Sequence, residues 1–443
     1  MTEELVEPPA DEVEEPPHAE PAGYAPSVAE RFALYQRAGG IITPILTAVF
    51  AFAMGGIVVV ATHHNPFKTY RAIFDGTGLN WFFHVGSHHI DIPFTSHHVW
   101  FPWDTAADVA SPHYNIAANS LAQTLLYSTT LALTGMAVAF AFRCGLFNIG
   151  GQGQYLAGAI TGVFIGSRFL GMGGPGHIAL AILLASLAGA LWGAIAGFLK
   201  ATTGAHEVIT TIMLNWIMIW GGVYLFQIGG PLQNHTDKTV PKSDPVALNA
   251  HLPVWWGNPN LQGLHVGLFI ALAGLIVFWL VLNRTTLGYE IRAVGFNADA
   301  ARYGGISVAR NYVVTMAIAG TFAGLAGGID VLGYAFRLDI LDIQVSNVGF
   351  IGIAVALLGR NKAVGVALSA LLFGALINGT STRNPGLAAV FDPRFAGNFS
   401  TIIQALVLLF IGADVLIIYL WQARRRLRLV RRPPVQPAEG PAA

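Results

Sequence analysis

Charge is scarce in this sequence. Only 11% of the 443 residues are Asp, Glu, Lys or Arg, 54% are hydrophobic, and the formal net charge is zero. Soluble domains carry about 25% charged residues, so the composition argues against a soluble protein and predicts an integral membrane protein. A chain without net positive charge also lacks the field that attracts nucleic acid. We therefore expect a lipid membrane as a partner, and no nucleic acid.

The sequence also lacks the motifs of a nucleotide- or metal-dependent enzyme. No Gly-x-x-x-x-Gly-Lys-Ser/Thr phosphate loop occurs, which excludes ATP hydrolysis by that route. The GMGGPG stretch at 171–176 follows no strand and predicts a turn, and Thr210 stands where a zinc-protease helix starting at His206 would need its second histidine. The lone cysteine, Cys144, can form no internal disulfide. We expect no catalytic residue, no metal site and no cofactor bound by this chain.

Ten apolar runs are candidates for helices that cross a bilayer, which takes about 20 residues each. Lipid tolerates no unpaired backbone groups, and none of the runs alternates like a barrel strand, so only helices fit. The sequence predicts an all-α polytopic bundle of about ten transmembrane helices. The expected spans are 40–62, 119–142, 151–170, 178–199, 206–228, 264–283, 311–333, 346–359, 363–379 and 399–420.

Lys and Arg fall mainly on one side of these spans, which predicts that this side and both termini are cytoplasmic. The expected layout is a disordered acidic tail at 1–36, a membrane domain at 37–422, and a basic, then proline-rich tail at 423–443 that favours anionic lipids. The loops at 63–118 and 229–263 would be external, and the loop at 284–310 cytoplasmic. The basic residues on the expected cytoplasmic side are Arg31, Arg37, Arg143, Lys200, Arg284, Arg292, Arg302, Arg310, Arg360, Lys362, Arg424, Arg425, Arg426, Arg428, Arg431 and Arg432.

Two spans carry a flat face of glycines at four-residue spacing. Such faces let helices approach closely, and we expect them to pack inside one bundle rather than against a second copy. The glycines are Gly189, Gly193 and Gly197 in one span and Gly320, Gly324 and Gly328 in the other.

The external loop at 63–118 holds eight of the fourteen histidines. Paired histidines near Asp91 and Asp104 could bind zinc or copper, but their spacing matches no closed four-ligand site. A loop that lies on the membrane surface, with Trp100 and Trp103 as interface anchors, fits the composition better.

Polar side chains inside the spans are costly and mark pathways or contacts between helices. Thr211 and Asn215 follow Glu207 at four-residue spacing and form a polar stripe on one helix face. The amide of Asn215 could contact a transported solute or another helix. Weaker pathway candidates are Asn347, Asn378 and Gln404. The spans lack the series of buried carboxylates that an ion-coupled carrier usually needs.

The stretch LGYEIRAVGFNADAARYGGIS, residues 287–307, is a polar insert between two spans. We expect two short helices separated by Gly295, with Asn297 as N-cap, Asp299 in the first turn, Arg302 in the last and glycines at the end. A helix of about two turns is unstable alone. An apolar face of Ala300, Ala301 and Tyr303 would bind a groove in a partner; a plain linker helix is the alternative.

Within this stretch, DAARYGG resembles the EAA loop of ABC importer membrane subunits, with Asp299 in place of Glu. The whole stretch is similar to the corresponding loop of the permeases for simple sugars and nucleosides that work with a basic-membrane-protein type lipoprotein. Three further segments match the pattern of these permeases, namely GLFNIGGQGQ at 145–154, VITTIMLNW at 208–216 and GFIGIAVALLGRNKAVGV at 349–366. In the first of them, Asn148 is expected to cap the turn. The resemblance covers residues 119 to 420.

The resemblance implies a permease subunit in a bacterial cytoplasmic membrane that carries a nucleoside or simple sugar. Its partners would be an ATPase subunit that binds ATP and Mg, a second permease, and an external solute-binding lipoprotein. The loop would be the coupling helix, with Glu290, Arg292, Asp299 and Arg302 in salt bridges or orienting roles. An ion-coupled secondary transporter or channel is the alternative, and a membrane-embedded enzyme fits less well. The residues expected to couple to the ATPase are Gly288, Glu290, Arg292, Gly295, Asn297, Asp299, Ala300, Ala301, Arg302 and Gly305.

Overall fold

The computed structural model describes residues 48–86, 88–91, 98–168, 171, 173–258, 262–381 and 384–390, together with 398, 401–403, 405, 406 and 409. All of them belong to one compact unit, Pro44–Ala443. The tails at 1–36 and 423–443, the pathway candidate Gln404 and most of the tenth expected span lie outside the described residues.

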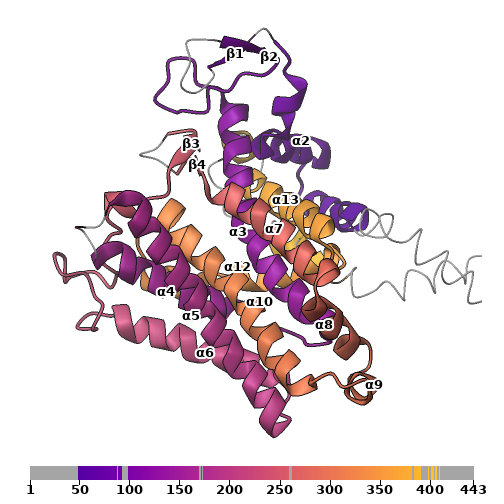
Figure 1. The fold of residues 1–443 in the computed structure, drawn as a ribbon. Coiled ribbons are helices and arrows are strands. Elements are labelled where there is room, and N and C mark those ends of the chain that lie inside the picture. The colour runs from indigo at the N-terminus through magenta and orange to yellow at the C-terminus, as the bar shows by residue number, and fades with distance from the viewer. Residues whose placement is uncertain are drawn as a thin grey trace, which may run out of the picture. The chain divides into compact units, whose positions relative to one another are not determined.

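The described chain is a helical bundle with two short β-hairpins (Figure 1). An apolar helix at Ala48–Ala61 comes first. The elements that follow are α2 (Pro66–Thr77), η1 (Leu79–Phe83), β1 (His88–Asp91), β2 (His98–Phe101), α3 (Ile116–Arg143), α4 (Gly151–Arg168), α5 (Gly174–Thr203), α6 (Glu207–Phe226), η2 (Leu248–Ala250), β3 (Val254–Trp256), β4 (Leu264–His265), α7 (Gly267–Arg284), α8 (Thr286–Phe296), α9 (Ala298–Tyr303), α10 (Val308–Asp330), the π-turn η3 (Val331–Ala335), α11 (Ile340–Val345), α12 (Val348–Leu358), α13 (Ala363–Gly379) and α14 (Pro385–Ala388).

Among the described residues, six helices are long and apolar enough to cross a membrane, so the chain is a multi-pass helical membrane protein. They are Ile116–Arg143, Gly174–Thr203, Glu207–Phe226, Gly267–Arg284, Val308–Ala335 and Ile340–Leu358. The helices Ala48–Ala61 and Ala363–Gly379 are apolar but shorter, and α4 occupies a further expected span. The number of about ten spans stays a prediction.

α3 and α10 form the centre of the bundle. α3 packs against α10, α12 and α13, while α10 also packs against α4 and α5. In the 18-residue apolar segment of α3, 83% of the residues are buried, whereas only 17% are buried in the corresponding segment of α6. α6 lies at the edge of the bundle (Figure 1), and its outward face of large apolar side chains is what lipid requires.

The glycine faces pack inside one chain, as predicted, and the two faces lie against each other. A Cβ built on Gly189 would lie 2.3 Å from the carbonyl oxygen of Gly320, and one on Gly324 would lie 2.5 Å from that of Ala185. On its other side, α10 is as close to α4, where a Cβ on Gly158 would lie 2.1 Å from the carbonyl oxygen of Gly324. Only glycine permits these backbone distances, so the glycines bring α4, α5 and α10 together inside one chain.

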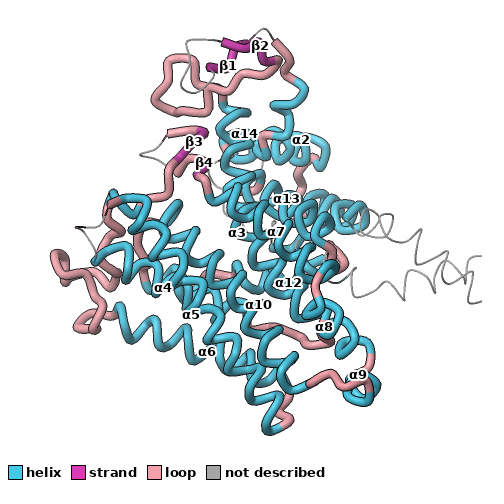
Figure 2. Tube along the Cα trace, viewed as in Figure 1, coloured by secondary structure: helices cyan, strands magenta, loops and turns pink. Residues whose placement is uncertain are grey.

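The hairpins lie at the end of the bundle opposite to α8 and α9 (Figure 2). β1 pairs with β2 in antiparallel register, with His88 opposite Phe101, and β3 pairs with β4 with Val254 opposite His265.

Trp103, which we expected to anchor the 63–118 loop to the membrane surface, packs in a cluster of tryptophans, and the position of the loop on the membrane stays a prediction. The ring of Trp103 stacks on Trp81, 5.4 Å between centroids, and Trp81 also contacts Trp256. The indole N–H groups of these three tryptophans donate to the backbone carbonyls of Phe82, Asp104 and Thr105. The tryptophans thus form a small core that joins this loop to the β3–β4 hairpin. Within the described residues, no three His, Cys, Asp or Glu side chains gather as a metal site requires.

Candidate functional site

The stretch at 287–307 folds into α8 and α9 at one end of the bundle. Asn297 caps α9 as predicted, because its side-chain oxygen accepts from the backbone N–H groups of Asp299 and Ala300, both at 3.0 Å. Gly305 follows with φ +82°, a left-handed conformation that suits glycine. The break between the helices is at Asn297 and not at Gly295, which lies inside α8.

Three of the predicted coupling residues hold the loop on the bundle instead of facing outward. A Cβ on Gly295 would lie 2.3 Å from the carbonyl oxygen of Arg143 at the end of α3, and one on Gly288 would lie 2.0 Å from that of Val281. The Ala301 side chain is only 6% exposed. Our expectation of an exposed Ala301 was therefore wrong, since this methyl group packs inward.

Two polar residues of α8 also lie against the bundle. The carboxylate of Glu290 accepts from the amide of Asn311 in α10 at 3.0 Å. Arg292 is half-buried. These contacts fix the orientation of α8 relative to the ends of α3 and α10.

The solvent-facing surface of α8 and α9 carries two exposed aromatic rings and one exposed ion pair. The side chains of Phe296 and Tyr303 are 95% and 94% exposed. Between them, Asp299 and Arg302 lie 3.7 Å apart on the solvent side of α9, next to the exposed Ala300. An exposed ion pair contributes little to stability, and exposed aromatic rings gain free energy only when a partner covers them. We therefore expect the outer surface of α8 and α9 to bind a partner.

The stripe at Glu207, Thr211 and Asn215 faces the bundle. Glu207 forms a salt bridge to Lys200 of α5 at 2.8 Å, and the Thr211 hydroxyl donates to the carbonyl of Glu207. The Asn215 amide donates to the carbonyl of Ile149 at 3.0 Å and accepts from the N–H of Gly153 at 2.7 Å. Asn215 thus joins α6 to the start of α4.

The neighbouring segment 145–154 is held by reciprocal amide contacts. Asn148, which we expected to cap the turn, pairs instead with Gln154 through two hydrogen bonds of 3.0 and 3.1 Å. The side-chain oxygen of Gln152 accepts from the backbone N–H of Gly349 in α12 at 2.9 Å. Contacts from α6 and α12 therefore hold the irregular entry into α4, while the side-chain nitrogen of Gln152 is buried without a hydrogen-bond partner.

Replacing Asn215 by leucine is expected to destabilise the protein by about 2 to 4 kcal/mol, because it leaves the N–H of Gly153 and the carbonyl of Ile149 buried without partners. Thermal denaturation of the purified protein in detergent measures the change. Replacement of Asn283, an exposed amide in the last turn of α7, by leucine is the control. An unchanged melting temperature for Asn215→Leu, together with a raised KM for uptake, would favour a pathway role instead.

The other pathway candidates lie in different surroundings. Asn347 is exposed at the start of α12. Asn378, near the end of α13, lines a cavity and donates to the carbonyls of Gly76 and Ser120 and to the hydroxyl of Thr124. Thr211 and Asn215 do not line this cavity, so the structure separates the candidates. Their roles in transport stay predictions.

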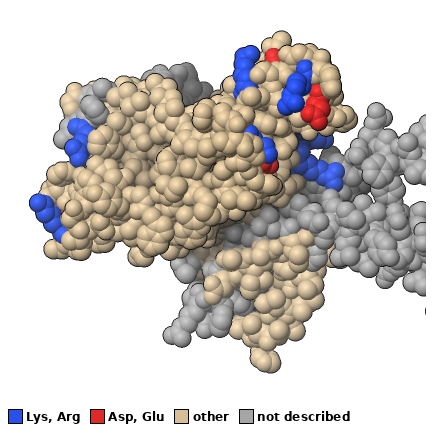
Figure 3. Space-filling model, turned by 90° about the horizontal axis from the view of Figure 1, so that it is seen from below, with Lys and Arg blue, Asp and Glu red and all other residues tan. Residues whose placement is uncertain are grey.

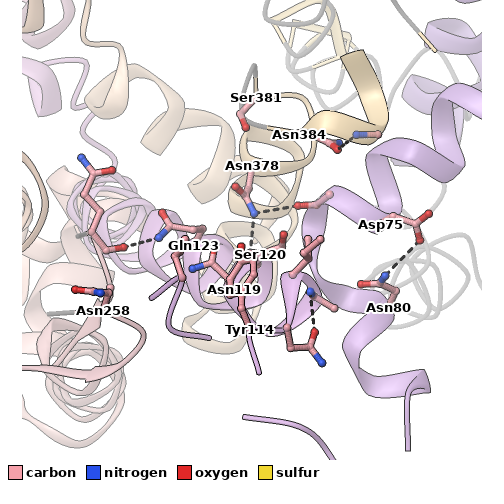
Figure 4. Close-up of a pocket in the computed structure, with 18 of the residues that line it drawn as sticks. Asp75, Asn80, Tyr114, Asn119, Ser120, Gln123, Asn258, Asn378, Ser381 and Asn384 are labelled. Atoms are coloured by element: carbon pink, nitrogen blue, oxygen red, sulfur yellow. Dashed lines mark hydrogen bonds between the residues drawn. The ribbon is translucent and has the colours of Figure 1, made fainter. Parts of the chain in front are cut away.

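The cavity, which we call the outer cavity, has a volume of about 1160 Å³ and is drawn in Figure 4. Two of the elements that line it, α2 and the β3–β4 hairpin, lie at the end of the bundle opposite to α8 and α9 (Figure 1). Its polar lining groups are mainly amides and hydroxyls, and the lining comes from α2, η1, α3, the β3–β4 turn and the end of α13, together with the loop before α3. Figure 4 shows Asp75 and Asn80 on one side of Asn378, and Gln123 and Asn258 on the other. The labelled residues are Asp75, Asn80, Tyr114, Asn119, Ser120, Gln123, Asn258, Asn378, Ser381 and Asn384.

Sequence reasoning missed most of this lining, although one signal was present. Asn115, Asn119 and Gln123 recur every fourth residue across the start of α3 and form a polar stripe, as Thr211 and Asn215 do in α6. The remaining lining residues come from loops whose arrangement no local pattern predicts.

Known proteins match this chain over most of its length. Residues 120–412 match the family described as branched-chain amino acid transport system / permease component. The guanosine ABC transporter permease protein NupP of Bacillus subtilis is 33% identical over 86% of this chain and 95% of its own. The nucleoside ABC transporter permease protein NupB of Lactococcus lactis is 32% identical over 85% and 92%, and the glucose ABC transporter permease protein TsgB13 of Haloferax volcanii is 31% identical over 83% and 86%.

No solved structure matches the chain significantly. The family match covers most of α3 and the elements from α4 to α13, which include the α8–α9 loop; α2 and η1, which also line the outer cavity, precede the matched residues. This chain therefore belongs to the family of branched-chain amino acid transport system permease components.

Proposed function

We propose that this chain is the transmembrane permease subunit of an ATP-binding cassette importer that carries a nucleoside, with a simple sugar as the second cargo class. Relatives that bear these cargoes in their names align with nearly the whole chain. The observation that carries the proposal is the exposed α8–α9 surface in a chain without a phosphate loop. A permease of this kind takes its energy from another chain and needs a surface to receive it.

The orientation follows from charge. The ends of α3, α5, α7 and α12 and the start of α10 lie on the α8–α9 side, and they carry Arg143, Lys200, Arg284, Arg360 and Arg310. Figure 3, seen from below relative to Figure 1, shows Lys and Arg spread over this face, with Asp and Glu in few places. By the positive-inside rule this face is cytoplasmic, so the ATPase subunits would bind here, and the external binding protein and the outer cavity would share the other side.

The mechanism is a mechanical coupling. ATP and Mg bound to the partner ATPase would close that subunit and displace α9 through Phe296 and Tyr303. Because Gly295 contacts the end of α3 and Glu290 contacts α10, a displacement of α8 reaches the two central helices directly. The helix pairs would then open alternately to the two sides of the membrane. A second permease subunit, related but not identical, would complete the pathway.

An ion-coupled carrier is the second candidate, and one contact favours it. The hydroxyl of Tyr155 in α4 donates to the carboxylate of Asp330 at the end of α10, and a carboxylate between helices can carry a coupling ion. Energy dependence separates the two functions. We expect uptake of guanosine by cells that express the whole system to stop when ATP is depleted and an ion gradient is kept. Continued uptake under this condition would contradict the importer.

A further inference from the structure

The outer cavity contains two acceptor atoms without partners. The side-chain oxygens of Asn80 and Gln123 are buried and receive no hydrogen bond. The Gln123 nitrogen donates to the carbonyl of Gln262, and the Asn80 nitrogen faces Asp75 at 3.4 Å, so these contacts orient both oxygens as the free acceptors. A buried acceptor without a donor is costly. The deficit ends when a ligand brings N–H or O–H groups.

The charge of the lining selects among such ligands. Of the described residues that line the cavity, two are carboxylates, Asp75 and Asp104, and none is Lys or Arg. The Asp104 carboxylate is already occupied, because it accepts from the Asn115 amide at 3.1 Å and from the N–H of Ala106 at 2.9 Å. Within the part of the chain that the structure describes, the Asp75 carboxylate receives only the long contact from Asn80. A phosphate group would meet two carboxylates and no Lys or Arg among the described lining residues, and would be repelled.

The remaining lining groups suit a neutral, donor-rich solute with an aromatic face. Asn119, Asn258 and Ser381 add further amides and a hydroxyl, and Tyr114 and Phe336 add aromatic rings. Amide side chains pair with the donor and acceptor edges of nucleobases, and aromatic rings stack on their faces. The volume of about 1160 Å³ is above the usual range for a small-molecule pocket, which leaves space for water beside the solute.

We propose that the outer cavity is a solute-binding site of the permease itself, which holds an uncharged nucleoside through the oxygens of Asn80 and Gln123 and rejects the phosphorylated form. This inference rests on the proposed function, and it adds a second selection step after the external binding protein. The site discriminates by the number of donors that the solute offers and by its charge.

The test measures binding of radiolabelled guanosine to the permease complex, purified with its ATPase but without the external binding protein, in lipid nanodiscs. Guanosine should bind saturably, and GMP and glucose should each compete at least about tenfold more weakly. Asn80→Leu and Gln123→Met should each weaken binding about tenfold, the usual effect of one lost hydrogen bond to a ligand.

Two further variants separate a loss of guanosine binding from a loss of folding. Asn283→Leu removes an exposed amide at the other end of α7 and should bind guanosine normally. Asn119→Lys adds a cation to the lining and should improve competition by GMP about tenfold. The proposal is overturned if wild type shows no saturable binding, if GMP or glucose competes as well as guanosine, or if Asn80→Leu and Gln123→Met bind normally.

ATP-driven uptake, measured on the same complexes after the binding protein is added, separates this proposal from the proposed function. Uptake with ATP in a complex that fails the binding test overturns the site and leaves the importer standing. Absence of an ATPase from the complex, with uptake independent of ATP, overturns the importer.

Discussion

Replacing both Phe296 and Tyr303 by aspartate should abolish ATP-driven uptake and weaken binding of the ATPase subunit at least about 100-fold. The two rings are almost fully exposed on the α8–α9 surface, and buried aromatic anchors contribute about 2 kcal/mol or more each at protein interfaces. Aspartate at both positions removes the apolar contact and adds two charges that the interface would have to bury. Co-purification of the ATPase with tagged permease measures the loss.

The amount of permease in the membrane should stay unchanged, because neither ring contributes to the core. Leu248, 86% exposed in the loop between α6 and α7, provides the control. Leu248→Asp should leave the ATPase bound. Normal uptake in the double aspartate variant would show that α8 and α9 are only a linker.

A bulky charged residue at Gly295 or Ala301 tests how α8 and α9 are attached to the bundle, and not how they bind the partner. Both positions face the bundle, so such variants would lift the loop off α3 and lose uptake without touching the partner surface. From the sequence alone these two residues were placed at the partner surface. The distinction depends on which way α8 and α9 face, and it makes Phe296 and Tyr303 the sharper test.

Gly324→Val should prevent the bundle from assembling. A Cβ at this position would lie 2.5 Å from the carbonyl oxygen of Ala185 and 2.8 Å from the Cα of Gly189. The atoms in the way are mostly backbone, so no side-chain rotation relieves the contact and α5 must move away from α10. We expect a cost of about 3 kcal/mol or more, seen as loss of the monodisperse peak in size-exclusion chromatography of the detergent extract.

Gly221 in α6 is the matched control for this substitution. No atom lies within 4 Å of a Cβ built there, and alanine favours a helix over glycine by about 1 kcal/mol. Gly221→Ala should therefore leave the melting temperature unchanged or raise it. A normal elution profile for Gly324→Val would contradict the close packing of α4, α5 and α10.

Patterns within one helix were predictable from the sequence, and contacts between segments far apart were not. The four-residue glycine spacing predicted close helix packing inside the bundle, and the Asn297 cap predicted the start of α9, because each pattern lies within a few residues of one helix. The direction in which Phe296 points was not predictable, since it follows from the packing of Gly295 on Arg143. The tryptophan core was not predictable for the same reason, because it joins Trp81 and Trp103 to Trp256, which is far away in the sequence.

The outer cavity shows the same limit. Its α3 side could be found from the spacing of Asn119 and Gln123, whereas Asn80, Asn258 and Asn384 reach it from segments separated by more than a hundred residues. Four motifs, in the same order as in the sugar and nucleoside permeases, predicted the family, and the match over residues 120–412 confirms it. The residues that couple and those that contact the cargo stay predictions.

The most direct test of the account is site-specific photo-crosslinking from position 303. A photoreactive phenylalanine analogue in place of Tyr303 should, in membranes that hold the whole system, form a crosslink to an ATPase subunit that changes in yield when ATP is added. The same analogue in place of Leu248 should give no such product. An active permease that crosslinks to no ATPase from position 303 would contradict the claim that α8 and α9 receive the energy of ATP.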